Sequence, residues 1–148
     1  MQMIREVMTQ SVETINSNAP VIEAAAKMRE LDVGSLPVCE AERLRGLLTD
    51  RDIAVRLVAS GLDPHTTPVS EIMTPDTTYC FDDQTLDEAG AAMEAHQIRR
   101  LPILNRKKQL VGMLSLGDLA VRTQSAEDRQ LAEEALQDIS EPSGLNRY

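Results

Sequence analysis

The sequence contains few aromatic residues and few basic ones. Its 148 residues include one Phe, two Tyr and no Trp, and 15 Lys and Arg against 24 Asp and Glu give a formal net charge of −9. Proteins bind duplex nucleic acids mainly through clustered basic side chains, and they bind single strands also by stacking bases on aromatic rings. The composition therefore argues against a nucleic acid as partner.

Cysteines and long apolar runs are also scarce. Cys39 and Cys80 are the only cysteines, and neither lies in a CxxC motif or near a His at ligand spacing. This pattern predicts no metal site and two reduced, partly buried thiols, and it leaves open whether they respond to oxidants. No segment approaches the ~20 apolar residues of a membrane span, and the first ten residues lack a signal-peptide pattern. We therefore expect no membrane partner and a cytoplasmic location.

The chain contains an internal duplication. Residues 4–9 (IREVMT) are matched by residues 69–74 (VSEIMT) at an offset of 65. Further pairs are 32–38 (DVGSLPV) with 97–103 (QIRRLPI) at the same offset, and 44–54 (LRGLLTDRDIA) with 110–120 (LVGMLSLGDLA) at an offset of 66. A register kept over this length indicates two copies of one structural unit.

Each copy predicts the same order of elements: a short extended piece, a helix, two strands joined by a polar turn, and a second helix. The first helices are expected at 20–31 and 85–96, where apolar residues recur at helical spacing. The strand pairs are expected at 35–40 with 44–48 and at 100–105 with 110–114, and the second helices at 53–60 and 119–124. The sequence therefore predicts an α+β fold built from two β-α-β-β-α repeats.

The predicted domain organisation follows from the size of one repeat. A unit of about 55 residues is marginally stable by itself. We expect repeats 1–60 and 69–123, joined by the linker 61–68, to pack sheet to sheet with pseudo-twofold symmetry and to form two related clefts. Residues 124–148 contain an amphipathic helix with one apolar stripe, followed by a frayed end; the stripe comprises Leu131, Ala135, Leu136 and Ile139.

The stretch GLLTDRD, residues 46–52, has two interpretations. Thr49 and Asp52 are three residues apart, as in a capping box that closes the first turn of a helix. A hydroxyl and a carboxylate at a helix start are also groups that bind the phosphate and the ribose of a nucleotide. Ser115 and Asp118 repeat the pair in the second copy, and the sequence leaves both interpretations open.

Basic residues near the two corners differ between the copies. Arg51 lies inside the first corner, where a guanidinium opposes the helix dipole unless an anion pairs with it. This favours the first copy as the stronger phosphate site. The second copy has Arg99 and Arg100 on the hairpin instead, and these are either a source of positive charge for its cleft or an ordinary solvated pair.

The duplicated pattern resembles a tandem pair of cystathionine-β-synthase (CBS) domains, the Bateman module. The features that carry the resemblance are MT before the first strand, a hydrophobic-Pro-hydrophobic strand, and GhhTxxD or GhhSxxD at a strand-to-helix corner, where h is a hydrophobic residue. The resemblance covers residues ~1 to ~123. Within the family it is strongest to the small stand-alone bacterial type, which includes proteins similar to the mycobacterial hypoxic response protein.

The resemblance implies a non-enzymatic sensor that forms a homodimer and has no catalytic cofactor. Adenosine-containing ligands such as AMP, ATP or NAD would bind in the two clefts between the repeats and alter packing or the binding of an unknown downstream protein. The alternative is a ligand-free stress-response or interaction module with closed clefts. The implied binding residues are Val12, Thr14, Ser35, Leu36, Pro37, Thr49, Arg51 and Asp52 for the first cleft, and Thr77, Tyr79, Arg100, Leu101, Pro102, Ser115 and Asp118 for the second.

Overall fold

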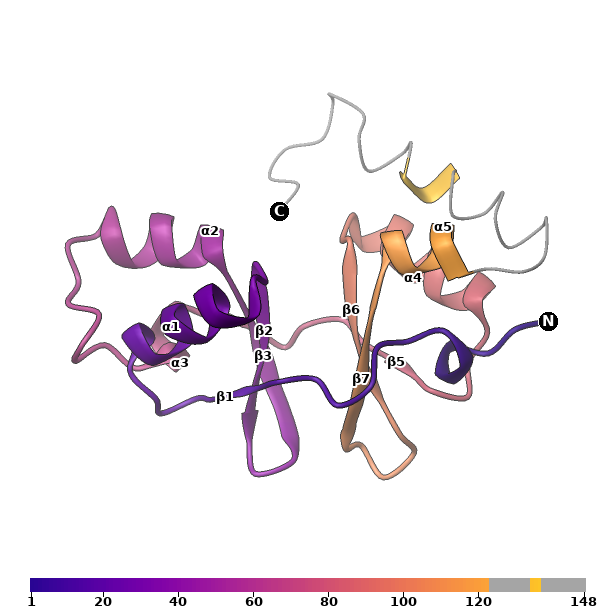
Figure 1. Ribbon diagram of the computed structural model, residues 1–148, viewed down its shortest axis with the longest axis horizontal. Helices are drawn as coiled ribbons and strands as arrows, with labels where there is room; N and C mark the ends of the chain where they lie inside the picture. The colour runs from indigo at the N-terminus through magenta and orange to yellow at the C-terminus, as the bar shows by residue number, and fades with distance from the viewer. Residues whose placement is uncertain (123–133, 137–148) are drawn as a thin grey trace. The chain divides into compact units, whose positions relative to one another are not determined.

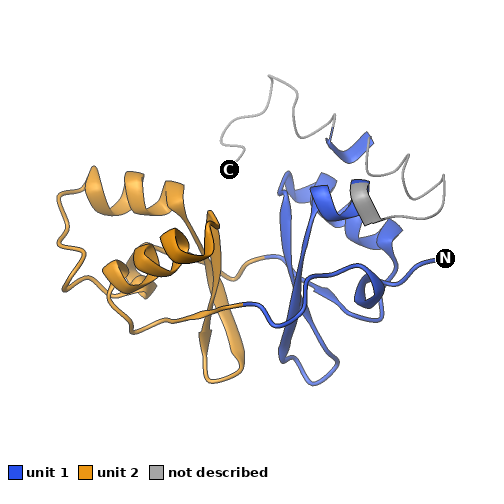
Figure 2. Ribbon diagram, in the orientation of Figure 1, with its two compact units in different colours: residues 1–12, 78–148 blue, residues 13–77 orange. Residues whose placement is uncertain are grey.

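The computed structural model describes residues 1–122 and 134–136. The chain divides into two compact units, shown in Figure 2: unit 1 comprises residues 1–12 and 78–148, and unit 2 comprises residues 13–77. Most of the predicted C-terminal helix lies outside the described residues. Its described part, residues 134–136, is helical, and Ala135 is fully buried in the core of unit 1.

Unit 2 is a four-stranded sheet with its helices (Figure 1). The strand order is β1-β2-β3-β4, with β1 parallel to β2 and the other neighbours antiparallel. The strands are β1 (Ile15–Asn16), β2 (Ser35–Glu40), β3 (Arg43–Thr49) and β4 (Thr74–Pro75). The helices are α1 (Val21–Leu31), α2 (Asp50–Asp52), the π-helix η2 (Ile53–Val58) and α3 (Val69–Ile72).

Unit 1 repeats this arrangement around a three-stranded sheet. The strand order is β5-β6-β7, with β5 parallel to β6 and β6 antiparallel to β7. The strands are β5 (Cys80–Phe81), β6 (Arg100–Leu104) and β7 (Leu110–Ser115). The helices are η1 (Ile4–Glu6), α4 (Leu86–His96) and α5 (Leu116–Arg122). The predicted α+β class, the two hairpins and the first helices are thereby confirmed.

The first helix of each repeat ends in the same way. Both α1 and α4 bury one apolar face against their own sheet, with Met28 and Met93 near its end. The next residues, Asp32 and Gln97, adopt left-handed conformations with φ of 53° and 52°. Such a residue stops a helix by turning the chain, although glycine is the usual choice. The helix and its end are therefore duplicated at an offset of 65 residues.

The second helix differs between the units. In unit 2, α2 continues directly into η2, where the Ala59 N–H donates to the Ala54 carbonyl at 3.0 Å, five residues earlier. The sequence predicted an ordinary helix here. In unit 1 the equivalent element, α5, is an α-helix. A π-helical turn is rare and widens the helix, so duplicated sequences produce different geometry after the two corners.

The segment that opens each repeat packs into the unit built mainly by the other repeat. In unit 1 the Ile4 N–H donates to the Gln84 carbonyl at 2.8 Å. In unit 2 the Val69 N–H donates to the Ala19 carbonyl, also at 2.8 Å. The sequence repeats and the compact units therefore differ by an exchange of opening segments, which the sequence analysis did not predict.

Two equivalent glycines permit these segments to dock. A Cβ atom on Gly112 would lie 2.7 Å from the Thr9 carbonyl oxygen, and one on Gly46 would meet the Thr74 carbonyl oxygen even more closely. Because any larger side chain would collide with backbone, both positions require glycine.

Candidate functional site

In unit 2 the predicted site residues gather at one end of the sheet. The parallel strands β1 and β2 start at this end, β3 finishes there, and α2 begins directly after β3. The register pairs Ser35 with Thr49 and places Thr14, the residue before β1, next to Pro37. The sheet therefore brings together Thr14, residues 35–37 and residues 49–52. Val12 belongs to the other unit.

Unit 1 places its predicted site residues in the same way. The register pairs Arg100 with Ser115 and Cys80 with Ile103, so Tyr79 lies next to Pro102. Asp118 follows in the first turn of α5. Tyr79, residues 100–102, Ser115 and Asp118 thus share one end of this sheet, whereas Thr77 belongs to unit 2.

Both strand-to-helix corners are capping boxes. The Thr49 N–H donates to Asp52 Oδ2 at 3.0 Å, and the Asp52 N–H donates to Thr49 Oγ1 at 3.1 Å. Ser115 and Asp118 make the same two hydrogen bonds, both at 3.0 Å. The capping interpretation is therefore confirmed in both units. It leaves ligand binding possible, because each carboxylate uses only one oxygen in its box.

The carboxylate of Asp52 has a further partner in unit 2. Its Oδ1 lies 3.8 Å from Arg56 Nε, and the Asp52 residue is only 8% exposed. Arg56 also donates to the carbonyls of Ile72 and Met73, at 3.4 and 3.0 Å. Arg56 therefore links this corner to the end of α3. Arg56 was not among the predicted site residues, although its position one helical turn after the acid was an available signal.

Asp50 is a second acid at the corner of unit 2 that sequence reasoning overlooked. Its N–H donates to the Gly34 carbonyl, and its Oδ1 accepts the Arg51 N–H, both at 2.9 Å. The corner of unit 1 has Leu116 and Gly117 at the equivalent positions. A carboxylate in this place opposes a second anion. The preference of a phosphate for the first copy stays a prediction, and Asp50 counts against it.

The segments before β1 and β5 are held by different contacts. In unit 2, Lys27 Nζ donates to the Thr14 carbonyl at 2.7 Å and lies 3.7 Å from Glu13 Oε2. In unit 1, the Tyr79 and Phe81 rings pack edge to face with centroids 5.5 Å apart. A basic residue therefore secures the segment before β1, whereas an aromatic pair lies where β5 begins.

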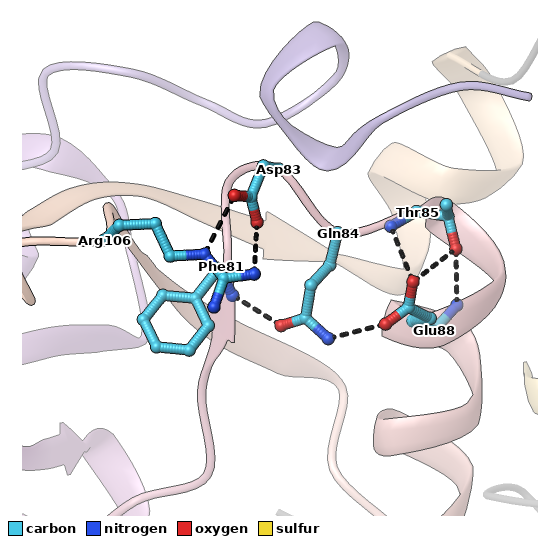
Figure 3. A network of polar contacts seen from close by, with 6 residues as sticks. All are labelled: Phe81, Asp83, Gln84, Thr85, Glu88 and Arg106. Atoms are coloured by element: carbon cyan, nitrogen blue, oxygen red, sulfur yellow. Dashed lines mark hydrogen bonds and ion pairs between the residues drawn. The ribbon is translucent and has the colours of Figure 1, made fainter.

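A polar network surrounds Phe81 in unit 1 (Figure 3). Arg106, from the turn between β6 and β7, donates to Asp83 through Nε and Nη2, both at 2.8 Å. These hydrogen bonds hold the pKa of Asp83 below its ordinary value of 3.8, and the charge of Arg106 acts in the same direction. Gln84 Nε2 donates to Glu88 Oε2 at 2.8 Å and lowers the pKa of that carboxyl.

The two cysteines are free and buried, with Cys39 5% and Cys80 4% exposed. Burial raises the pKa of both thiols above 9.0, so both are protonated at neutral pH. Across residues 1–122 and 134–136, no three His, Cys, Asp or Glu side chains come together to hold a metal ion. Within the same residues, no helix has the length and apolar character to cross a bilayer.

Each unit has a sheet end with a capped corner, and comparison with known families also finds two copies of one domain. The CBS domain model matches residues 4–59 and again residues 69–122. The chain therefore belongs to the CBS domain family and carries the domain twice, as a regulatory CBS pair.

Two of the relatives are bacterial proteins. The CBS domain-containing protein YhcV of Bacillus subtilis is 44% identical over 140 residues, which cover 95% of this chain and 96% of YhcV. Hypoxic response protein 1 of Mycobacterium tuberculosis is 37% identical over 117 residues, covering 78% of this chain and 81% of that protein. The predicted resemblance to the hypoxic response type is thereby confirmed.

Solved structures show the same fold. Hypoxic Response Protein I, crystallised with two coordinated zinc ions, is 35% identical with a TM-score of 0.77, and the match covers 83% of this chain and 100% of that one. CBSX2 in complex with AMP is 22% identical with a TM-score of 0.70, covering 93% of this chain and 98% of that one. At that identity the second likeness supports the fold alone.

Proposed function

We propose that this CBS pair is a non-enzymatic sensor that binds an adenosine-containing ligand, such as AMP, ATP or NAD, at the sheet end of each unit. One observation carries the proposal: both units place a hydroxyl and a carboxylate at a helix start, beside the first residues of two parallel strands. A protein of the same fold, CBSX2, has been crystallised with AMP, so this fold can hold such a ligand.

Each group at the sheet end has a distinct role in this proposal. Asp52 and Asp118 accept hydrogen bonds from the ribose hydroxyls through the carboxylate oxygen that takes no part in the capping box. A carboxylate is well suited to this role. Thr49 and Ser115 bind the phosphate together with the neighbouring backbone amides. The first residues of β2 and β6 present their backbone to the adenine edge.

Signalling requires that the ligand distinguishes two states of the protein. A ligand shifts an equilibrium only by its difference in affinity for the two states. We propose that the responding change is in packing or in the binding of a protein partner, and that the protein acts as a homodimer in the cytoplasm. Val55 and Val58 on η2 are 49% and 67% exposed, and their burial in a dimer would be favourable.

A second function is supported by the capping boxes themselves. Because all four hydrogen bonds of the two corners are made within the protein, the corners need no ligand to be stable. The alternative is therefore a ligand-free interaction module, and the similarity to hypoxic response protein 1 is compatible with it.

Calorimetric titration with AMP, ATP and NAD tests the sensor proposal. We expect at least one ligand to bind and Asp118→Asn to weaken that binding strongly, because an amide accepts from only one of its two positions. Asp52→Asn should do the same for the other unit. Asp50→Asn is the matched control, since it removes the same charge from the same turn and should leave binding equal or tighter. Absence of heat with all three ligands at millimolar concentration would contradict the proposal.

The two candidate functions also differ in what the purified protein carries. If the sensor proposal is correct, denaturing freshly purified protein should release an adenosine-containing compound that mass spectrometry identifies. Release of no such compound, together with no heat in the titrations, would favour the interaction module.

A further inference from the structure

Aromatic side chains of this chain are concentrated at one sheet end. The sequence has one Phe and two Tyr; Tyr79 and Phe81 lie where β5 begins, and the remaining Tyr148 is the last residue. Residues 13–77, which form unit 2, contain none. Tyr79 and Phe81 are two positions apart, so they lie on the same side of the strand. Their rings meet at an interplanar angle of 87°.

A series of contacts fixes the Phe81 ring. The guanidinium carbon of Arg106 lies 4.2 Å from the ring centroid, a cation–π contact. Two hydrogen bonds from Arg106 to Asp83, both 2.8 Å, hold the guanidinium in that position (Figure 3). The backbone N–H of Phe81 donates to Gln84 Oε1 at 2.7 Å. The ring and the backbone of Phe81 are therefore both fixed by contacts. The Tyr79 ring packs against this fixed side chain.

Unit 2 has none of these contacts at the equivalent positions. At an offset of 65 residues, Tyr79 corresponds to Thr14, Phe81 to Asn16 and Arg106 to Ala41. Lys27 holds this segment through the Thr14 carbonyl instead. The backbone is secured in both units, but only unit 1 presents a ring there.

We propose that Tyr79 is the residue on which a purine base stacks, and that unit 1 therefore recognises the base more strongly than unit 2. The inference rests on the proposed function. Tyr79 is 38% exposed, and an edge-to-face contact leaves at least one face of its ring uncovered by Phe81. Base stacking on an aromatic ring accepts any base, because every base has a π-face. Arg106 and Asp83 are positioning residues that act through Phe81.

The strand register of unit 1 indicates the order in which a bound nucleotide would contact these residues. Tyr79 lies next to Pro102 on β6, while Ser115 at the end of β7 pairs with Arg100. Neighbouring strands are about 4.8 Å apart, so β5 and β7 are separated by about 10 Å. A nucleotide placed across this end has its base at Tyr79 and its ribose and phosphate toward Ser115 and Asp118.

Titration of the full chain with AMP and with ribose 5-phosphate, which lacks the base, tests the inference. We expect Tyr79→Leu, which keeps an apolar side chain but removes the ring, to weaken AMP binding roughly ten- to a hundred-fold. Tyr79→Phe keeps the ring and should stay within about two-fold of wild type. Ribose 5-phosphate should bind equally to all three proteins. Thr14→Ala is the matched variant in unit 2 and should leave the tighter AMP site unchanged.

Fluorescence supplies a second readout that does not depend on affinity. The sequence has no Trp and only two Tyr, so in a Tyr148→Phe background Tyr79 is the only tyrosine. AMP should quench its emission and ribose 5-phosphate should not. Arg106→Gln releases the Phe81 ring, so it should reduce this quenching while leaving ribose 5-phosphate binding unchanged.

The outcomes separate the inference from the proposed function. If wild type binds none of the adenosine-containing ligands, both are wrong. If wild type binds AMP and Tyr79→Leu binds it with the same affinity, with no quenching of Tyr79, the inference alone is wrong. Circular dichroism of each variant checks that the loss of binding is not a loss of folding.

Discussion

Unit 1 and unit 2 hold nearly the same backbone with different side chains. Each docks the opening segment of the other repeat against a glycine, ends its first helix with a left-handed residue, and starts its second helix with a capping box. The segment before the first strand, by contrast, is held by Lys27 in unit 2 and borders the Tyr79–Phe81 pair in unit 1. The features that both units share therefore indicate what the fold requires.

The features that differ are the better indicators of function. A capping box occurs in both units because both helices need one, so the box does not distinguish the two sheet ends. Asp50 has no counterpart in unit 1, and Tyr79 and Arg106 have none in unit 2. These side chains change the charge and the apolar surface of the two sheet ends. If the sheet ends bind ligands as proposed, we expect the two sites to differ in what they bind.

The largest expected effect comes from filling the space at the shared glycines. Gly46→Ala and Gly112→Ala should each lower the free energy of unfolding by about 1–3 kcal/mol, because the new Cβ collides with the docked segment. The loss should be larger at Gly46, where the nearest atom is a backbone oxygen, than at Gly112, where the flexible Met8 side chain shares the contact. Urea unfolding followed by circular dichroism measures both.

A third glycine provides the control for this pair. The nearest atom to a Cβ on Gly117 is Ser115 Oγ at 3.6 Å, an ordinary contact, so Gly117→Ala should change the unfolding free energy by no more than about 0.5 kcal/mol. Equal losses at Gly46 and Gly117 would show that close docking of the opening segments is not what requires glycine.

A smaller effect is expected at the two corners. Thr49→Ala and Ser115→Ala each remove the hydroxyl that accepts the third amide of the helix, at a cost of about 1 kcal/mol in unfolding free energy. Because the hydrogen bonds are equivalent, the two losses should agree within about 0.5 kcal/mol. Thr49→Ser keeps the hydroxyl and serves as the control. A difference well above that value would mean that the corners are not energetically equivalent.

The smallest effect is a local pH dependence confined to unit 1. The pKa of Asp83 is lowered by its hydrogen bonds from Arg106, so its stabilising contribution is complete above the ordinary value of 3.8 and is lost as the pH falls through the lowered value. An NMR titration should give a midpoint below 3.8 in wild type and a higher one in Arg106→Gln, because the largest cause of the lowered pKa is removed.

Asp63 in unit 2 is the internal reference for that titration. Its pKa is lowered by hydrogen bonds from the His65 backbone and side chain, which Arg106→Gln does not touch. An unchanged Asp63 midpoint with a shifted Asp83 midpoint is the expected pattern. If Asp83 titrates alike in wild type and variant, the hydrogen bonds to Arg106 do not persist in solution.

The sequence was sufficient to predict the two hairpins and the first helices and to locate the two corners, although it left capping and ligand binding open there. Periodic apolar residues located α1 and α4, and the spacing of Thr49 and Asp52 located the first corner. These signals are local, because a helix face and its cap are encoded within a few consecutive residues. Because the sequence is duplicated, each of these signals occurs in both copies. The hairpins and the first helices could therefore be predicted in both.

The sequence did not reveal which distant residues meet. Arg56 near Asp52, Lys27 on the Thr14 carbonyl and Arg106 over Phe81 join residues that are separated by 4, 13 and 25 positions. The contact four positions away was readable from helical spacing. The other two depend on strand register and on the path of a turn, which residue types alone do not specify.

The sequence by itself determined that this protein has two copies of one α+β unit and belongs among CBS pairs, because repetition, periodicity and corner motifs are properties of residue order. Tertiary structure decided that the opening segments are exchanged between the units and that Tyr79 stands beside a ring held by Arg106. Both depend on packing between residues far apart in the chain. Such packing is selected by the shape and energy of the whole fold.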